Sequence, residues 1–231
     1  MRNPFRYFNS WPEVIRLVVM MYIRYPLSLR QVEDILFERG IDICHETVRF
    51  WWNRFGPMFA AAIRKRRLHH WSFSQWRWHL DEVFVRINGE THYLWRAVDH
   101  EGEVLEVFAT KRRDRRAALR FLKRTMKRYG RPRSIVTDRL RSYRSAMKVI
   151  GNSVDQECGR WFNNRAENSH QPFRRRERAM AKFRDIKTLQ KFGAAHASIH
   201  NHFNHDRHLN RRDGSVRAIS LSRDVVFHSL Q

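Results

Sequence analysis

Residues 76–110 read WRWHLDEVFVRINGETHYLWRAVDHEGEVLEVFAT, and the fold of the chain is decided in this stretch. Apolar and polar side chains alternate with a period of two, which indicates extended strands and not a helix. Asn88-Gly89 tolerates the positive φ of a tight hairpin turn, and His100-Glu101-Gly102 marks a second turn. We therefore expect three antiparallel strands, the second and third over residues 91–98 and 104–110.

The chain then alternates between helix and strand. Asp114 can cap a helix that ends at Gly130, and residues 134–138 form a short apolar strand that ends in a carboxylate. A helix from about residue 140 to 150 and a last helix around Glu167 follow. A meander of three strands, extended by a parallel strand through a crossover helix, is the ribonuclease-H-like order. The predicted fold class is α/β, a mixed sheet flanked by helices.

Ahead of the sheet, residues 10–57 predict three helices. Residues 40–43 form a turn between the second helix and a third over residues 45–55, which gives a helix-turn-helix layout. A plain three-helix packing unit is the alternative. Capping boxes mark the starts of the first two helices: Ser10 with Glu13, and Ser28 with Gln31.

Polar side chains on these helices and just after them are expected to contact DNA. Residues 58–75 predict a basic connector that lies along phosphates, with a solvated surface run as the alternative. The predicted contacts are Arg30, Arg49, Asn53 and Arg54 from the helices and Arg64, Lys65, Arg66 and Arg67 from the connector.

Charge predicts a polyanionic partner, because 46 Lys and Arg against 23 Asp and Glu give a net charge of +23. Composition alone leaves DNA and RNA equally open. Cys44 and Cys158 form no zinc pattern and no disulfide scaffold, so we expect two buried thiols in a reducing cytoplasm. The longest apolar run, residues 17–23, is too short to span a membrane. We expect a cytoplasmic protein without a membrane partner.

Carboxylates at the ends of neighbouring strands carry the predicted chemistry. Asp81 on the first strand and Asp138 after the fourth are adjacent in this topology and can share a metal ion. Glu167 offers a third acid on the last helix, and Arg174 lies two helical turns on, where it can grip a phosphate. Pro172 implies that this helix begins near Glu167 or bends there.

The same residues allow other interpretations. Asp81 and Asp138 can cap a strand end or pair with surface arginines, and Glu167 can pair with neighbouring arginines. Glu82 and Asp99 are competing candidates, although Asp99 lies in a turn, where Asp is common. A late cluster of histidines has no spacing with a known metal mechanism, so we expect no metal there. The cluster comprises His196, His200, His202, His205 and His208.

At these motifs the sequence resembles the transposases of the insertion-sequence-six family, compact bacterial enzymes with an Asp-Asp-Glu triad. The resemblance covers about residues 10–208. The matching segments are YPLS at 25–28, DE at 81–82, YLWRAVD at 93–99, TD at 137–138 with SY at 142–143, NNRAENSHQP at 163–172 and RRRER at 174–178.

The resemblance implies that Asp81, Asp138 and Glu167 are the triad and that Arg174 accompanies it. It implies a catalytic domain over residues 76–208, with two Mg²⁺ or Mn²⁺ ions per site and DNA contacts from Arg175, Arg176 and Arg178. The partners are double-stranded terminal inverted repeats and target DNA. At least a homodimer, associated with the nucleoid, is expected.

The sequence departs from the family in two respects. Only 28 residues separate Asp138 from Glu167, fewer than in much of the wider superfamily. Residues 209–231 do not resemble the usual ending, so a decayed and inactive copy is one hypothesis. A helix-turn-helix regulator and a nuclease that does not join strands are the other rivals. The regulator does not need the three acids together.

Overall fold

The computed structural model describes residues 3–70, 77–138, 141–151, 156–158, 163–180 and 182–209. Side chains are not described at residues 67–70, 158, 164, 165 and 204–209. The chain divides into two compact units: residues 1–70 with 198–231, and residues 71–197. No helix in the described part is long and apolar enough to cross a membrane. The tail expected from residue 209 and the end of the connector lie almost wholly outside the described residues.

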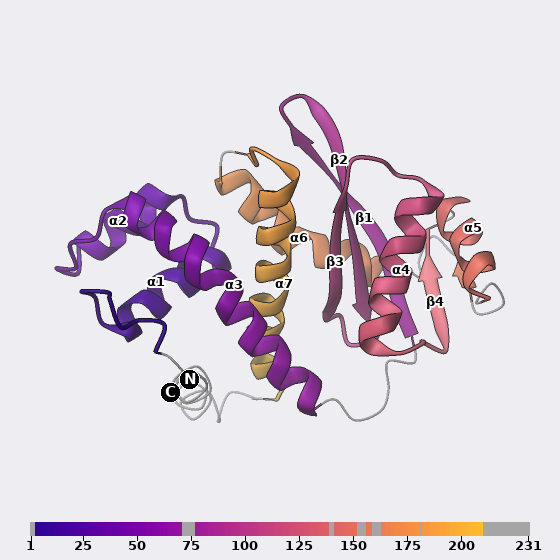
Figure 1. The fold of residues 1–231 in the computed structure, drawn as a ribbon, viewed down its shortest axis with the longest axis horizontal. Coiled ribbons are helices and arrows are strands. Elements are labelled where there is room, and N and C mark those ends of the chain that lie inside the picture. The colour runs from indigo at the N-terminus through magenta and orange to yellow at the C-terminus, as the bar shows by residue number, and fades with distance from the viewer. Residues whose placement is uncertain are drawn as a thin grey trace. The chain divides into compact units, whose positions relative to one another are not determined.

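The first unit contains three helices, α1 (Pro12–Arg24), α2 (Leu29–Phe37) and α3 (His45–His70), together with the last part of α7 (Ile186–Leu209). α1 and α2 both pack against α3, as Figure 1 shows. The apolar stripe predicted on α1 is confirmed, since its residues are all buried. The stripe comprises Ile15, Val18, Val19, Tyr22 and Ile23.

The two predicted helix starts differ in outcome. The Ser28 capping box is present, because the Ser28 side chain accepts from the Gln31 amide and the Gln31 side chain accepts from the Ser28 amide. The Ser10 box is wrong. α1 begins at Pro12 with Trp11 as its cap and no side-chain hydrogen bond there. Proline needs no capped amide and already has helical φ, so it starts the helix itself.

α3 continues far beyond the predicted end at residue 55 and includes Pro57. Pro57 removes one helical hydrogen bond, which normally stops a helix. Here the helix persists because Phe59, Ala60 and Ile63 on its next turns are buried. Packing is close, since a Cβ at Gly56 would meet the Trp52 ring at 2.8 Å. The described part of the basic stretch after residue 58 is therefore helical.

The second unit is built on a five-stranded sheet of order β3-β2-β1-β4-β5. Its strands are β1 (Arg77–Ile87), β2 (Glu90–Asp99), β3 (Val104–Thr110), β4 (Ser134–Thr137) and β5 (Gln156–Cys158). β1, β2 and β3 are antiparallel, while β4 pairs parallel to β1 and β5 parallel to β4. The predicted meander and parallel extension are confirmed. The chain has the ribonuclease-H-like fold; β5 was not predicted.

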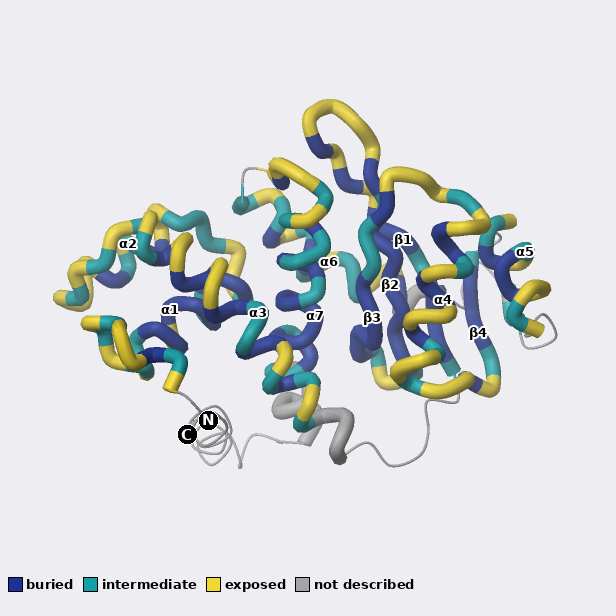
Figure 2. The backbone as a smooth tube through the Cα atoms, in the orientation of Figure 1, coloured by how far each residue is buried: buried dark blue, intermediate teal, exposed yellow. Residues whose placement is uncertain are grey.

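Helices cover both faces of this sheet (Figure 1). α4 (Arg115–Tyr129) and α5 (Arg141–Ile150) enclose a core with the side chains of Trp78, Leu80 and Trp95. On the other face lie α6 (Asn164–Ala179) and the first part of α7 (Ile186–Leu209). Figure 2 shows the buried strands between these layers.

Local signals in this unit are confirmed. Asn88 and Gly89 have φ of 51° and 84°, as a tight hairpin requires. Asp114 caps α4 by accepting from the Ala117 amide, and Gly130 ends the helix with φ of 77°. α6 begins at Asn164 with Glu167 in its first turn, in keeping with the expected start near Glu167, and continues through Pro172.

Candidate active site

Three carboxylates converge where β1 and β4 lie side by side. The pairing of Leu80 with Thr137 places Asp81 and Asp138, the next residues of each chain segment, beside one another. Glu82 joins them, and one carboxylate oxygen from each of the three lies within 4.8 Å of the others. β1 thus supplies two successive acids, whose side chains leave the strand toward opposite faces of the sheet.

Asp81 faces α6, and its two carboxylate oxygens have different neighbours. Its Oδ1 accepts from the Glu82 amide at 2.8 Å. Burial, together with the negative charges of Asp138 and Glu167, raises the pKa of Asp81 to about 7. The Arg96 charge and the Glu82 amide act in the opposite direction. Asp81 is therefore a carboxylate that a cation would stabilise strongly.

Arg96 lies directly across from Asp81 in the β1–β2 pairing. Its side chain is completely buried, and burial lowers its pKa to about 10. One nitrogen donates to the Ser169 carbonyl on α6 at 3.0 Å, whereas Nε and Nη1 have no hydrogen-bond partner among the described residues. Arg96 therefore links Asp81 to the helix that carries Glu167.

His170 approaches the same carboxylate from α6. Its Nε2 lies 3.7 Å from Asp81 Oδ2, beyond hydrogen-bond distance. Burial, with the charges of Arg96 and Arg174, lowers the pKa of His170 to about 3. The imidazole is therefore neutral at physiological pH, and its contact with Asp81 is not an ion pair.

Glu82 faces α4 and α5 and is almost fully buried. Tyr143 on α5 donates its hydroxyl to Glu82 Oε2 at 3.1 Å. Arg113, just before α4, lies 3.1 Å from Oε1 in an ion pair that is not aligned as a hydrogen bond. Burial, together with the charges of Asp138 and Asp81, raises the pKa of Glu82 to about 7.

α6 is fastened to β1 at its beginning, which brings its acid toward the cluster. The Asn163 side chain donates to the Leu80 carbonyl at 3.0 Å. Glu167 lies one turn further and His170 nearly another, on the same face of the helix. Glu167 is exposed, and its charge acts on Asp81. Arg174 is half-buried and pairs with Glu177 at 2.7 Å.

The carboxylate oxygens of this cluster are suitable ligands for a divalent cation. Hard cations such as Mg²⁺ prefer carboxylate oxygens, and the cluster contributes three carboxylates at short range. Two of these have pKa values raised to about 7, so their negative charges are poorly compensated by the protein. A bound cation would supply that compensation.

The other predicted site residues fall into distinct environments. Arg30, Arg49, Asn53 and Arg54 are exposed on α2 and α3, and Arg175 and Arg178 are exposed on α6. Arg176 is buried, with its guanidinium over the Phe192 ring, so it is not placed to contact DNA. Arg64 donates to the Ser198 hydroxyl, Lys65 is exposed and Arg66 is half-buried. The Arg67 side chain is not described.

Two other expectations have structural outcomes. Asp99 is buried and caps its turn by accepting from the amides of Glu101 and Glu103, as expected for a turn aspartate. Cys44 is exposed, so the expected burial is wrong there, because it precedes α3 on an open turn. The late histidine cluster has no such outcome, because the side chains of His205 and His208 lie outside the described residues, so the expectation that it binds no metal stays a prediction.

Sequence reasoning did not single out Arg96 or His170, and it ranked Glu82 as a weaker candidate. Arg96 lies on a strand that reads as ordinary sheet, and its position opposite Asp81 depends on the hairpin register. His170 lies three residues after Glu167, a helical spacing that could have indicated a shared face.

Comparison with known proteins identifies the family. A family model described as DDE domain matches residues 75–206. The transposase for the insertion sequence-like element IS431mec of Staphylococcus aureus is 35% identical over 173 residues, covering 73% of this chain and 75% of the relative. The transposase for IS257 in transposon Tn4003 of Staphylococcus aureus matches at the same identity and coverage.

A solved structure, the Mos1 transposase catalytic domain with raltegravir and Mg, aligns with a TM-score of 0.36 and 14% identity, over 64% of this chain and 89% of that chain. The sequence matches are far closer and extend over most of the chain. With the acidic cluster on a ribonuclease-H-like sheet, they show that the chain belongs to the DDE transposases of the insertion-sequence-six family, which are polynucleotidyl transferases.

Proposed function

We propose that Asp81, Asp138 and Glu167 are the catalytic carboxylates of this transposase and hold two Mg²⁺ or Mn²⁺ ions. The observation that carries the proposal is the convergence of Asp81 and Asp138 beside a helix whose Glu167 acts electrostatically on Asp81. Two ions bound closely need shared carboxylate ligands. Asp81, between Asp138 and α6, is suited to be the shared one.

When bound, the ions would supply an activated water for cleavage and charge stabilisation for the joining step. The residues of the chain hold the reacting groups around them. The Glu82 amide fixes one oxygen of Asp81, and Asn163 keeps the start of α6 against β1. Arg174, seven residues after Glu167, is proposed to exchange Glu177 for a DNA phosphate.

For the front helices we propose recognition of the terminal inverted repeats. α3 presents Arg49, Asn53 and Arg54 on its exposed side, while its apolar side packs on α1 and α2. Such an arrangement suits entry into a major groove. Residues 10–57 are the proposed recognition module, 58–75 the basic link and 76–208 the catalytic domain. Arg30, Lys65, Arg175 and Arg178 are proposed phosphate contacts.

We further propose that the enzyme acts as at least a homodimer on double-stranded DNA within the nucleoid. Joining requires two element ends and a target, and the net charge of +23 favours holding several duplexes together. Affinity for DNA should accordingly fall steeply as salt rises.

The test is joining of a labelled element end to plasmid DNA in the presence of Mg²⁺. We expect Glu167→Gln to abolish joining while leaving binding of the labelled end intact. Glu101→Gln removes an exposed acid far from the cluster in sequence and serves as the matched control. Joining by Glu167→Gln at the wild-type rate would rule out Glu167. A wild-type protein that binds ends but never joins them would favour the decayed copy.

A further inference from the structure

We propose that the exposed faces of α4 and α5 form a second DNA-binding surface, which holds the phosphate backbone of the target duplex next to the carboxylates. This surface is distinct from the contacts proposed on α2, α3 and α6. The inference rests on the proposed function, because a target duplex is needed only if the enzyme joins strands.

α4 carries the first part of this surface. Every exposed residue of α4 is Arg or Lys. Two of them, Arg124 and Arg128, are engaged by the buried carboxylate of Glu106. A separate row follows the helix at intervals of three or four residues, one helical turn apart, over about 16 Å. The α4 row comprises Arg116, Arg120, Lys123 and Lys127.

The α4 row is not neutralised by the protein. Within the described part of the chain, none of its four members forms an ion pair with an acidic side chain. α4 contains no Asp or Glu. Four like charges on adjacent turns repel one another, which costs helix stability. A polyanion lying along the row would remove that repulsion.

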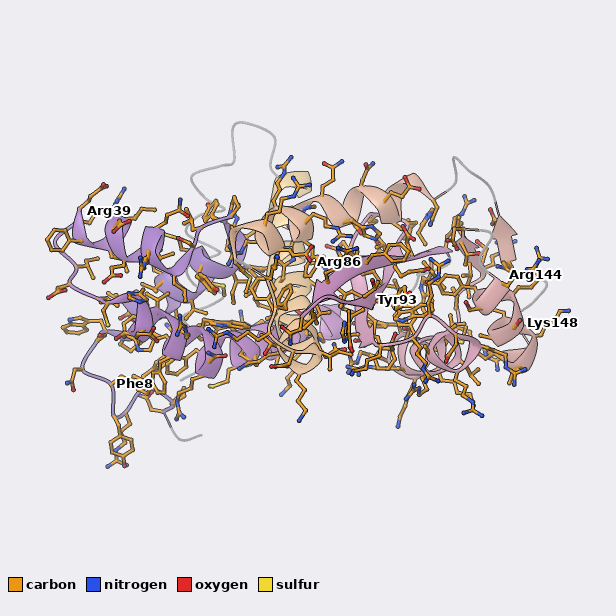
Figure 3. The ribbon with its side chains drawn as sticks, turned by 90° about the horizontal axis from the view of Figure 1, so that it is seen from above. Phe8, Arg39, Arg86, Tyr93, Arg144 and Lys148 are labelled. Carbon is orange, nitrogen blue, oxygen red and sulfur yellow. The ribbon has the colours of Figure 1, made fainter. Side chains whose placement is uncertain are left out.

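α5 continues the surface. Arg141, Arg144 and Lys148 are exposed and recur at a spacing of three and four residues, so they share one side of the helix. Figure 3 shows Arg144 and Lys148 pointing away from the ribbon. α4 and α5 pack against each other through the core that includes Phe121 and Met147.

Both rows begin next to the acidic cluster. Arg113, three residues before Arg116, is paired with Glu82, and Tyr143, between Arg141 and Arg144, donates to the same carboxylate. A duplex held by these rows therefore has its backbone close to Asp81 and Asp138, where a phosphate must lie to react.

The side chains of the two rows favour binding to duplex DNA that does not depend on its sequence. The exposed Arg and Lys side chains supply charge-assisted contacts to phosphates, and no Asn or Gln accompanies them to read the edge of adenine. A target accepted at many sequences needs contacts of this kind. α3, in contrast, presents Asn53 among its arginines.

The experiment compares two variants that each remove four positive charges from the sheet unit. The test variant changes the α4 row to Gln, a good helix former. The control variant changes four exposed cations outside both rows, Arg86, Lys111, Arg184 and Lys187, to Gln. Fluorescence anisotropy measures binding to a random-sequence duplex across salt concentrations. Joining of a pre-cleaved element end is measured against plasmid concentration.

We expect the test variant to need about tenfold more plasmid for half-maximal joining. For the random duplex, the slope of log affinity against log salt concentration should be less negative by about three to four in this variant. The control should change both quantities much less, and binding of the terminal-repeat duplex should be unchanged in the test variant.

Three outcomes would overturn the proposal. The test variant could keep the wild-type plasmid dependence and salt slope, or the control variant could show the same losses. The test variant could also lose only its binding to the terminal-repeat duplex, which would assign the row to the element end. The anisotropy measurement requires no catalysis. A wild-type protein that fails to join strands would therefore refute the proposed function and leave the DNA-binding result interpretable.

Discussion

The two sides of β1 place adjacent carboxylates in opposite situations. Glu82 is enclosed by α4 and α5 and already has Tyr143 and Arg113 as partners. Asp81, on the α6 side, has a backbone amide at one oxygen and a neutral imidazole 3.7 Å from the other. Burial nevertheless raises the pKa of both to about 7.

The difference indicates a division of roles between two residues of similar electrostatics. A carboxylate that already has a hydroxyl donor and an arginine charge as partners orients its surroundings, whereas one with an oxygen that lacks such a partner can bind an ion. We therefore assign ion binding to Asp81 and positioning to Glu82. The pKa shift alone does not separate these roles; the ion pair that Glu82 forms with Arg113 does.

The largest expected effect tests that assignment directly. Asp81→Asn should lower joining of the labelled end by about a thousandfold or more, because a proposed ion ligand is lost. Glu82→Gln should lower joining by about tenfold to a hundredfold, as expected of a residue that acts through others. Rates are measured at saturating Mg²⁺, with circular dichroism to verify folding.

Equal losses for the two variants would contradict the comparison and make Glu82 an ion ligand as well. The change at Glu82 is close to isosteric, so it isolates charge from size. Mn²⁺ binding, followed by paramagnetic resonance, gives an independent reading: the number of bound ions should fall in Asp81→Asn and stay constant in Glu82→Gln.

A smaller effect is expected at Arg96, which belongs to the Asp81 side. Arg96→Met removes the donor to the Ser169 carbonyl and the positive charge that lowers the pKa of Asp81, so that pKa should rise further. We expect joining to fall about a hundredfold. The free energy of unfolding should fall by about 2–4 kcal/mol, as measured by urea denaturation.

Arg176→Met is the matched control, since Arg176 on α6 is nearly as buried but lies over the Phe192 ring of α7. It should destabilise the protein without a comparable loss of joining per folded molecule. If Arg176→Met lowers joining as much as Arg96→Met, Arg96 has only a structural role.

The sheet and its two aspartates were predictable because their signals are local. Alternation, the Asn88-Gly89 turn and the Asp114 cap each depend on a few neighbouring residues. Asp138 follows directly from the end of a short apolar strand. Their adjacency then required only the strand order of the fold.

The partners of the acids were not predictable, because they depend on contacts between distant segments. Arg96 meets Asp81 through a pairing register, and Tyr143 meets Glu82 from 61 positions along the chain. The predicted end of α3 was wrong for a related reason: burial of Phe59 and Ile63 outweighs the local helix-breaking signal of Pro57.

The smallest expected effect concerns Tyr143, on the Glu82 side. Tyr143→Phe removes a single hydrogen bond to Glu82 Oε2 and should lower the free energy of unfolding by about 1–2 kcal/mol. In the double variant with Glu82→Gln, the loss should be smaller than the sum of the two separate losses, because both changes weaken the same bond. In the double variant of Tyr143→Phe with Arg96→Met, on the other side of the sheet, the two losses of unfolding free energy should add to within about 0.5 kcal/mol. Strong coupling between Tyr143 and Arg96 in urea denaturation would show that the two sides of β1 act as one network, and the separate roles of Asp81 and Glu82 would no longer follow.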